Sequence, residues 1–558
     1  MFNEIEMTFS SRRSPVLSRH CMVTASQPLA VSAGLEILSK GGCAADAAVA
    51  IAAALNVTEP TSTGIGGDCF ALYYDAGKRK ICALNGSGRA PAALTLEKIK
   101  KENLISPEGE LPPFHPYTIT VPGACAGWYD LVERFGKLPL SEILSPAIRM
   151  AEEGFPVAPV TAYFWQRGVE RQLAHSPGGL ELTIDGRAPQ AGEIFRNPGL
   201  ARTFRMIAEF GKQTFYQGEI AQAIARAVQN AGGCLSETDL ANHTSTWDTP
   251  ISSNYRGFFI WECPPNGQGL ATLLALNILE GFDLSRHPPL SAQRLHLQIE
   301  AMRLAFADTR WYVADPVFNT APIKELLSQE YAEHRRKLIN PQKATLNQSY
   351  GTPVSSSDTV YFCVVDNAGN ACSFINSNYM GFGSGIVPSG WGFSLHNRGH
   401  NFSLNPSHPN ALAPGKRPYH TIIPGMITHI TDGPLPMGEV TEDGELIAVF
   451  GVMGGFMQPQ GHLQVVSALL DDHLDPQSVL DLPRFCIEDG QSGGNVALEQ
   501  GIPEEVFDWL KSMGHSLRMV NGVERALFGR GQIIVKDRER QVLWGGSDPR
   551  ADGCAMGF

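Results

Sequence analysis

The stretch Ser355-Ser-Ser-Asp-Thr-Val-Tyr-Phe-Cys-Val-Val-Asp366 joins a polar, serine-rich segment to an apolar run that begins with Thr359. The β-branched and aromatic residues of this run predict a strand. A second strand-like run, Asn370–Asn376, follows a short turn in which Gly369 supplies the backbone freedom, so the two runs predict a hairpin. Thr359 at the head of the first strand has two interpretations: an ordinary strand residue, or the first residue of a chain that cuts itself there.

The second interpretation has a definite chemistry. A threonine hydroxyl is a poor nucleophile unless a base lies beside it. Cleavage between Asp358 and Thr359 would release an α-amine whose reference pKa of about 7.7–8.0 suits a general base near neutral pH. From this stretch alone the ordinary strand is the simpler interpretation, so other parts of the chain must decide.

Composition limits the classes to which the protein can belong. The net charge of −12, with no basic stripe, argues against a nucleic-acid partner. No run reaches the roughly 18 apolar residues of a membrane span, and no secretion signal is visible. Eleven cysteines without a CxxC pair predict reduced thiols in a cytoplasmic protein, and the fifteen dispersed histidines lack metal-site spacing. We therefore expect no metal, no cofactor and no membrane partner.

The rest of the chain mixes helical and strand-like segments. Residues 29–57 predict two helices, of which the second is rich in alanine and apolar nearly all round, as in a buried helix. Residues 292–312 predict a long amphipathic helix. Beyond residue 359, strand-like runs recur with helices at 461–470 and 503–513 between them. Strands and helices that share a core in this way predict a layered α+β architecture.

Two glycine-rich turns could belong to a catalytic site. Phe450-Gly-Val-Met-Gly-Gly455 follows a strand, and the amides of Gly454 and Gly455 could approach a ligand closely as an oxyanion hole. An ordinary strand–helix turn explains these two glycines equally well. Gly490-Gln-Ser-Gly-Gly494 matches the G-x-S-x-G pattern of serine hydrolases, but a strand follows it where that pattern requires a helix, so we expect a loop.

Taken together, ordered motifs over nearly the whole chain resemble the γ-glutamyltransferase family of N-terminal-nucleophile hydrolases. The matching segments are Ala30–Ala50, Val121–Gly123, Asp248–Ile251, Tyr255–Gly257, Ala305–Asp308, Lys416–Pro418 and Asp548–Gly553.

This resemblance implies a four-layer αββα fold that is made as an inactive precursor. The precursor would be cut into a large segment (1–358) and a small segment (359–558), which together form one αββα unit. On the family pattern Thr359 is the nucleophile, Ser377 is a hydroxyl that assists it, and Gly454 and Gly455 form the oxyanion hole. The implied partners are a small amide substrate and the two subunits of one precursor, and a dimer of the processed heterodimer is compatible with this scheme.

The substrate clamp departs from the family pattern. Ser87 replaces the family's substrate arginine, and Arg89 lies two positions later. Asn401 replaces the aspartate that grips the glutamyl α-amine, and a buried ammonium facing Asn401 would lose its charge partner at a cost of about 3–5 kcal/mol. Arg89 is then our candidate for binding a substrate carboxylate, with a purely structural role as the alternative.

Three further positions are altered around the same pocket. A family serine pair becomes His420-Thr421, and a family asparagine becomes Tyr379. We expect the acyl pocket to be lined by Tyr379, Asn401, His420 and Thr421. These departures are typical of the branch that contains oxamate amidohydrolase and the cephalosporin acylases.

The sequence therefore predicts a self-processing amidohydrolase that forms a threonyl acyl-enzyme, acting on a small carboxylate-bearing amide or on an acyl amide. One alternative is a true γ-glutamyltransferase or glutathione hydrolase with a remodelled clamp. A second alternative is a catalytically degenerate family member that acts as a binding protein.

Overall fold

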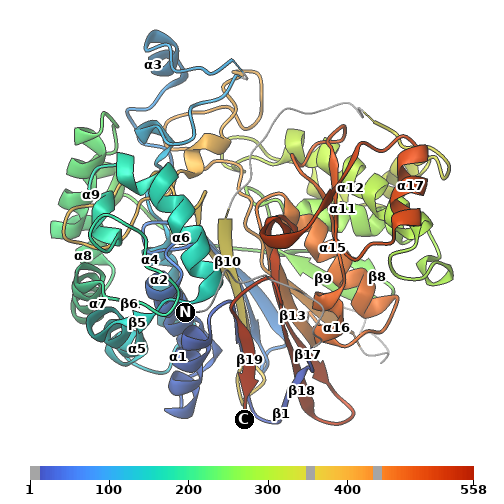
Figure 1. Cartoon of the computed structure of the whole chain (residues 1–558), viewed down its shortest axis with the longest axis horizontal. Coiled ribbons are helices and arrows are strands. Elements are labelled where there is room, and N and C mark those ends of the chain that lie inside the picture. Colours follow the sequence, from blue (N-terminus) through green and yellow to red (C-terminus); the bar gives the residue numbers. More distant parts are fainter. Residues whose placement is uncertain (1–12, 108, 347–357, 431–442) are drawn as a thin grey trace.

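A computed structural model of the protein describes residues 13–107, 109–346, 358–430 and 443–558. Two seven-stranded sheets lie face to face, and a helical layer covers the outer face of each sheet (Figure 1). The fold is thus a four-layer αββα sandwich of the α+β class, as expected from the resemblance.

The first sheet contains the predicted hairpin. In spatial order its strands are β19 (Cys554–Gly557), β2 (Met22–Ala25), β10 (Asp358–Val365), β11 (Ala371–Tyr379), β3 (Asp68–Asp75), β4 (Lys80–Gly86) and β7 (Thr246–Asp248). Along β10 the side chains alternate: Tyr361 and Cys363 face the second sheet, whereas Phe362 and Val364 face the helices. Both faces of the strand are buried, which is why its sequence is apolar from Val360 to Val365.

The second sheet has the same number of strands. Their spatial order is β1 (Val16–Ser18), β18 (Val542–Ser547), β17 (Arg530–Asp537), β13 (Glu445–Met453), β12 (Gly425–His429), β9 (Phe258–Glu262) and β8 (Ile251–Tyr255). A smaller sheet combines β14 (Phe485–Ile487), β15 (Val496–Glu499) and β16 (Leu517–Val520), and β5 (Phe155–Pro156) pairs with β6 (Ile194–Phe195). Each large sheet contains strands from both sides of residue 358.

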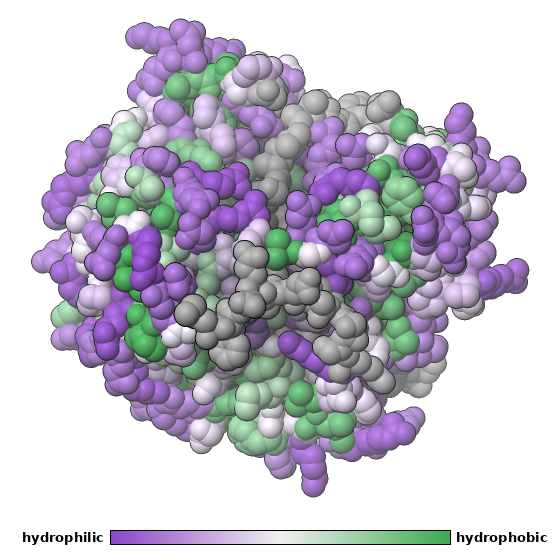
Figure 2. Space-filling view, viewed as in Figure 1, coloured by the Kyte–Doolittle hydropathy of each residue, from purple (hydrophilic) through white to green (hydrophobic). Residues whose placement is uncertain are grey.

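The helices divide between the two outer layers (Figure 1). On the side of the first sheet lie α1 (Pro28–Ser39), α2 (Ala44–Thr58), α4 (Ala124–Phe135), α5 (Leu140–Glu153), α6 (Pro159–Arg171), α7 (Pro198–Phe210), α8 (Gln213–Gln217), α9 (Glu219–Asn230) and α10 (Glu237–Ala241). On the side of the second lie α11 (Gly269–Leu279), α12 (Ala292–Tyr312), α13 (Ile323–Leu326), α14 (Gln329–Arg336), α15 (Met457–Leu470), α16 (Pro476–Asp481) and α17 (Glu504–Ser512). A short helix, α3 (Leu96–Lys101), stands apart at one edge (Figure 1). Figure 2 shows mainly hydrophilic residues over the outer helices on both sides of the face in view.

The burial of two helices tests the sequence-based predictions. Every residue of α2 is buried, which confirms the prediction of an internal alanine-rich helix. Residues 292–312 form the predicted long helix, but its predicted amphipathic character is wrong, because α12 is buried continuously from Arg294 to Thr309. Some of its polar side chains bond protein groups instead of water: Arg294, for example, forms a two-pronged ion pair with Asp472 at 2.8 and 2.7 Å.

Two other features of the chain follow from the described residues. The segment Gly490–Gly494 forms the turn between β14 and β15, which confirms that it is a loop and not a nucleophile elbow. Within the described ranges, no helix combines the length and the apolar composition needed to cross a membrane.

Candidate active site

The hairpin β10–β11 places Thr359 at an interruption of the sheet. The register is regular from Val365↔Ala371 to Val360↔Asn376, but Asp358 lies opposite Tyr379, so the pairing shifts at Thr359. Such irregularities re-aim the side chain at which they occur. Thr359 is fully buried.

Ser377 is the nearest polar partner of the Thr359 side chain. The two hydroxyl oxygens lie 3.1 Å apart. Ser377 Oγ also accepts a hydrogen bond from the backbone N–H of Tyr379 at 2.8 Å, and Tyr379 adopts a positive φ of 77°. Ser377 Oγ thus lies within hydrogen-bond distance of both the Tyr379 N–H and the Thr359 hydroxyl.

The glycine pair lies at the exit of β13, beside the first turn of α15. Gly454 and Gly455 have φ angles of +126° and +61°, so both use backbone conformations that glycine permits. The carbonyl oxygen of Gly454 accepts the amide of Met457, and that of Gly455 accepts Gln268 Nε2, whereas neither glycine amide donates to another described residue. Two free amides at a strand exit can stabilise an oxyanion.

Gln458 connects the glycine turn with the nucleophile. It lies in the first turn of α15, and its Nε2 approaches Thr359 Oγ1 to 3.5 Å. Its Oε1 accepts the backbone N–H of Ile423 at 2.9 Å, which fixes the orientation of the amide. Gln458 can therefore orient the Thr359 hydroxyl without accepting its proton.

A buried carboxylate, Asp68, organises the opposite wall of the site. Its Oδ2 accepts from His420 Nε2 at 3.0 Å and lies 3.3 Å from both His396 Nδ1 and Arg398 Nε. Burial alone would raise the pKa of Asp68, but the charge interaction with His396 and hydrogen bonds from His396 and His420 hold this pKa well below its usual value. Gly88 N donates to the second oxygen at 3.1 Å. Asp68 is therefore an anion whose acceptor positions are already occupied.

His420 is a neutral part of this network. Burial, followed by the nearby Arg398 charge, lowers the pKa of His420 to about 3. Since Nε2 donates to Asp68, Nδ1 carries the lone pair, and it has no partner among the described residues. Thr421, the next residue, accepts a hydrogen bond from Arg398 Nη1 at 2.8 Å.

Tyr379 and Asn401 complete the predicted pocket. The Tyr379 hydroxyl donates to Asn401 Oδ1 at 2.5 Å, and the guanidinium of Arg398 lies over the Tyr379 ring at 4.4 Å. Gln268 Nε2 bridges the carbonyl oxygens of Thr421 and Gly455 at 2.6 and 2.9 Å. The structure thus connects eight of the nine predicted site residues through direct contacts or one intermediate residue.

Arg89 is the residue that these contacts do not include. Its guanidinium donates to the carbonyl oxygen of Thr244 at 3.3 Å, and Arg417 Nη2 donates to the same oxygen at 3.3 Å. Burial and then the charge of Arg89 lower the pKa of Arg417 to about 10. Arg89 therefore has a structural partner, and its role toward a substrate carboxylate stays a prediction.

A cavity of about 700 Å³ reaches the glycine turn. Its lining includes Met453, Gly454 and Met457 around the glycine turn, and Met380 and His400 from the chain that follows β11. The volume is within the usual range for small-molecule sites, which is about 300–1,000 Å³. The cavity therefore offers a route by which an amide could reach the glycine amides.

The sequence pattern of gamma-glutamyltranspeptidase matches residues 30–558. The chain belongs to this family. The family match spans both segments that flank Thr359 and includes all nine predicted site residues.

Relatives and solved structures support the same assignment. The chain is 35% identical to a glutathione hydrolase-like YwrD proenzyme of Bacillus subtilis, over 97% of this chain and 99% of the relative. It is 32% identical to an oxamate amidohydrolase proenzyme of Klebsiella pneumoniae, with the same coverage. The crystal structure of a cephalosporin acylase from Bacillus halodurans superposes with a TM-score of 0.90 at 45% identity, covering 100% of this chain and 99% of that one.

Three contributors to this gamma-glutamyltranspeptidase-family site were not predicted from the sequence: Asp68, Arg398 and Gln458. Gln458 directly follows the glycine turn, so its place at the start of the next helix was a usable signal. Asp68 and Arg398 are about 330 residues apart in the chain, and only the tertiary fold brings them together. Among them, Arg398 is a fully buried cation beside the predicted acyl pocket.

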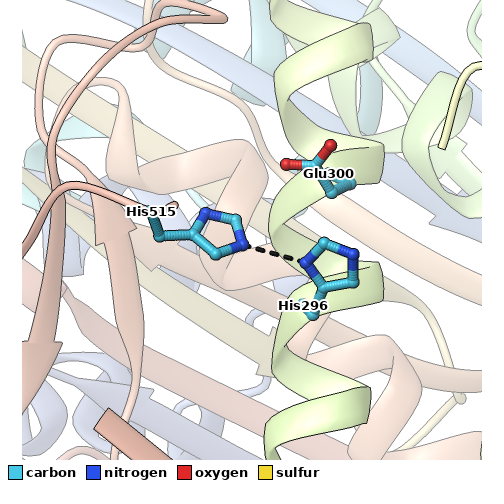
Figure 3. A group of neighbouring side chains, drawn as sticks. All are labelled: His296, Glu300 and His515. Atoms are coloured by element: carbon cyan, nitrogen blue, oxygen red, sulfur yellow. Dashed lines mark hydrogen bonds between the residues drawn. The ribbon is translucent and has the colours of Figure 1, made fainter. Parts of the chain in front are cut away.

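A second cluster of titratable side chains lies apart from these residues. His296 and Glu300 project from α12 toward His515 (Figure 3), and one ligand atom from each lies within 4.8 Å of the others. His296 Nδ1 and His515 Nε2 are hydrogen-bonded at 2.9 Å, while His296 Nε2 bonds the Asn340 carbonyl oxygen at 2.8 Å. Because that carbonyl can only accept, His296 carries its proton on Nε2, and the shared proton belongs to His515.

Hydrogen bonding accounts for this cluster better than a metal ion does. Metal ligation would require both facing nitrogens to present lone pairs, and the positive charge of Arg303, 3.6 Å from Glu300, opposes a cation. Glu300 Oε2 accepts the backbone N–H of Thr345 at 2.9 Å. The cluster thus anchors residues 340–345 to α12, on the chain that leads toward Thr359.

Proposed function

We propose that the chain is a self-processing amidohydrolase that cuts itself between Asp358 and Thr359 and then hydrolyses an amide through a threonyl ester. The contact that carries this proposal is the 3.1 Å approach of Thr359 Oγ1 to Ser377 Oγ at the break in the β10–β11 pairing. Two glycine amides near the same site, and the names of relatives that are proenzymes, support it.

The first reaction is the cleavage of the precursor. Thr359 Oγ adds to the Asp358 carbonyl carbon, the peptide C–N bond breaks, and the hydroxyl proton passes to the departing α-amine, with Ser377 as the nearest relay. Water then hydrolyses the resulting ester, which releases the Asp358 carboxylate and restores the Thr359 hydroxyl. The products are segments 1–358 and 359–558.

The second reaction uses the amine that the first one creates. The α-amine of Thr359 takes the hydroxyl proton while Oγ attacks the substrate carbonyl, and the proton then passes to the leaving amine. The amides of Gly454 and Gly455 stabilise the oxyanion, and each such donor contributes about 3–4 kcal/mol in comparable sites. Water finally releases the acid from the threonyl ester. The wall that contains Tyr379, Asn401 and His420 holds the acyl group.

Electrophoresis and N-terminal sequencing of the purified protein test the cleavage. We expect the 60.5 kDa chain to give two products, the smaller beginning at Thr359, and Thr359→Ala to stay uncut and inactive. An uncut wild-type chain after long incubation, or a new N-terminus elsewhere, would contradict the proposal.

A substrate panel separates this function from its two alternatives. A true γ-glutamyltransferase would turn over glutathione with a dipeptide acceptor at least as fast as any other amide. A binding protein would be cut normally yet hydrolyse nothing. We expect instead that amides whose acyl part bears a carboxylate but no ammonium group are hydrolysed faster than γ-glutamyl amides, which carry both groups.

A further inference from the structure

Two buried hydrogen-bond donors near the nucleophile have no acceptor among the described residues: Arg398 Nη2 and Asn401 Nδ2. The other polar atoms of both side chains are occupied. Arg398 uses Nε toward Asp68 and Nη1 toward Thr421, and Asn401 uses Oδ1 to accept from the Tyr379 hydroxyl. The two side chains are therefore held in place with one donor each left over.

Such donors are costly when they stay unpaired in a protein interior. Roughly nine in ten buried polar groups have a partner, and a charged donor is the most expensive exception. A guanidinium nitrogen without an acceptor is well suited to a carboxylate oxygen, because hydrogen bonds between two ionised groups are the strongest. Arg398 and Asn401 both contact Tyr379, so their two unpaired donors lie in the same region and indicate a binding site for an anionic acceptor.

The two donors are directly connected to the nucleophile. The Arg398 guanidinium lies over the Tyr379 ring, and Asn401 bonds the hydroxyl of the same residue. The backbone N–H of Tyr379 donates to Ser377 Oγ, which contacts Thr359 Oγ1. A group bound by the donors would thus belong to the part of a substrate that lies beside Thr359, which is its acyl part.

The charges around the donors favour an anion over an ammonium group. Asp68 is the carboxylate in contact with Arg398, and its two oxygens already accept from His420 and Gly88. His420 is neutral. An ammonium group here would meet the Arg398 cation with no free carboxylate among the described contacts, whereas a carboxylate would meet two vacant donors.

We propose that Arg398 and Asn401 bind a carboxylate on the acyl part of the substrate, so that the preferred substrates are monoamides of dicarboxylic acids that carry no α-amino group. This inference rests on the proposed amidohydrolase function. It assigns the carboxylate to Arg398 and not to Arg89, whose guanidinium already bonds a backbone carbonyl.

The test compares succinyl and glutaryl p-nitroanilides with their neutral methyl esters, and measures kcat/KM for each. Wild type should prefer the free acids at least tenfold. Asn401→Asp places a carboxylate beside Arg398 and should lower the ratio of kcat/KM for the acids to kcat/KM for the esters about 10- to 100-fold. Arg398→Lys keeps the positive charge but removes the guanidinium nitrogens, and should reduce the preference for the free acids over the esters. Arg286→Gln, an exposed arginine on the surface, is the matched control and should change neither substrate class.

The outcomes distinguish this inference from the function on which it rests. Equal hydrolysis of acids and esters by wild type, or a preference that neither Asn401→Asp nor Arg398→Lys reduces, overturns the carboxylate site while the amidohydrolase function stands. If the preference for free acids is lost in Arg89→Gln alone, Arg89 binds the carboxylate, and the proposed site at Arg398 and Asn401 is overturned. A wild-type chain that is cut but hydrolyses no amide refutes the proposed function itself. If Arg398→Lys does not mature, competitive inhibition of wild type by free glutarate, weakened in Asn401→Asp, supports the site, and its absence overturns it.

Discussion

Ser377→Ala should slow both the self-cleavage and the turnover of amides. The variant loses the hydroxyl that lies 3.1 Å from Thr359 Oγ1. Loss of a positioned proton-transfer group costs about 10²- to 10⁴-fold in rate, or about 3–5 kcal/mol of activation free energy. The variant also removes the hydrogen bond that the Tyr379 N–H donates to Ser377 Oγ at 2.8 Å, which should lower the free energy of unfolding by about 0.5–1.5 kcal/mol.

Two companion variants separate chemistry from stability. Ser377→Thr keeps the hydroxyl and should retain most of the cleavage rate. Ser373→Ala removes a buried hydroxyl from the same strand, where Ser373 Oγ lies 2.8 Å from the Tyr361 hydroxyl, and should lower stability without affecting cleavage. The assay is a time course of precursor cleavage by electrophoresis, followed by amide turnover of the mature fraction. If Ser377→Ala matures and turns over at the wild-type rate, or if Ser373→Ala slows cleavage equally, Ser377 is not the relay.

Two further predictions concern the glycine turn and a buried histidine. Gly454→Ala places a Cβ on a backbone with φ of +126° and 3.2 Å from Gly529 Cα, so it should displace the Gly454 amide. The kcat should fall about 10²- to 10³-fold with little change in KM. An unchanged kcat would show that Gly454 does not belong to the oxyanion hole. Burial, followed by the charges of Arg303 and His296, lowers the pKa of His515 to about 3, against about 6.5 in an unfolded chain, so the unfolded state binds the proton more readily below about pH 6.5. His515 should therefore make the free energy of unfolding about 2 kcal/mol lower at about pH 5 than at about pH 7.5. In urea unfolding, His515→Gln should remove this part of the pH dependence. If the pH dependence of His515→Gln equals that of wild type, His515 is not its source.

Local sequence patterns predicted those parts of the molecule whose causes are local. The hairpin around Gly369, the buried helix α2 and the loop at Gly490–Gly494 each depend on neighbouring residues, and each is confirmed. The burial of α12 was not predicted, because its polar side chains resemble a solvated face until their partners, such as Asp472, are known. Periodicity alone does not distinguish water from a buried ion pair.

The same distinction applies to the candidate site. Thr359 and the glycine pair lie in recognisable local contexts, so their positions could be proposed from the sequence. The role of Arg398 could not be proposed from the sequence. It depends on the contact with Asp68, which is about 330 residues away, and on the Nη2 donor that has no acceptor among the described residues. A replaced residue such as Asn401 shows that a specificity has changed, but the new specificity depends on which charged groups the fold gathers around it.

The mixing of strands from both sides of residue 358 has a consequence for a cleaved chain. In the first sheet, β10 lies between β11, which follows it in the chain, and β2, which precedes it by more than 300 residues, while β19 from the C-terminus closes the far side of β2. Once the Asp358–Thr359 bond is cut, the two polypeptides cannot separate without dismantling both sheets, and refolding after denaturation becomes a bimolecular reaction whose yield depends on concentration. The persistence of the processed protein would then depend on a slow rate of unfolding. It would not require that the two separated segments can fold together again.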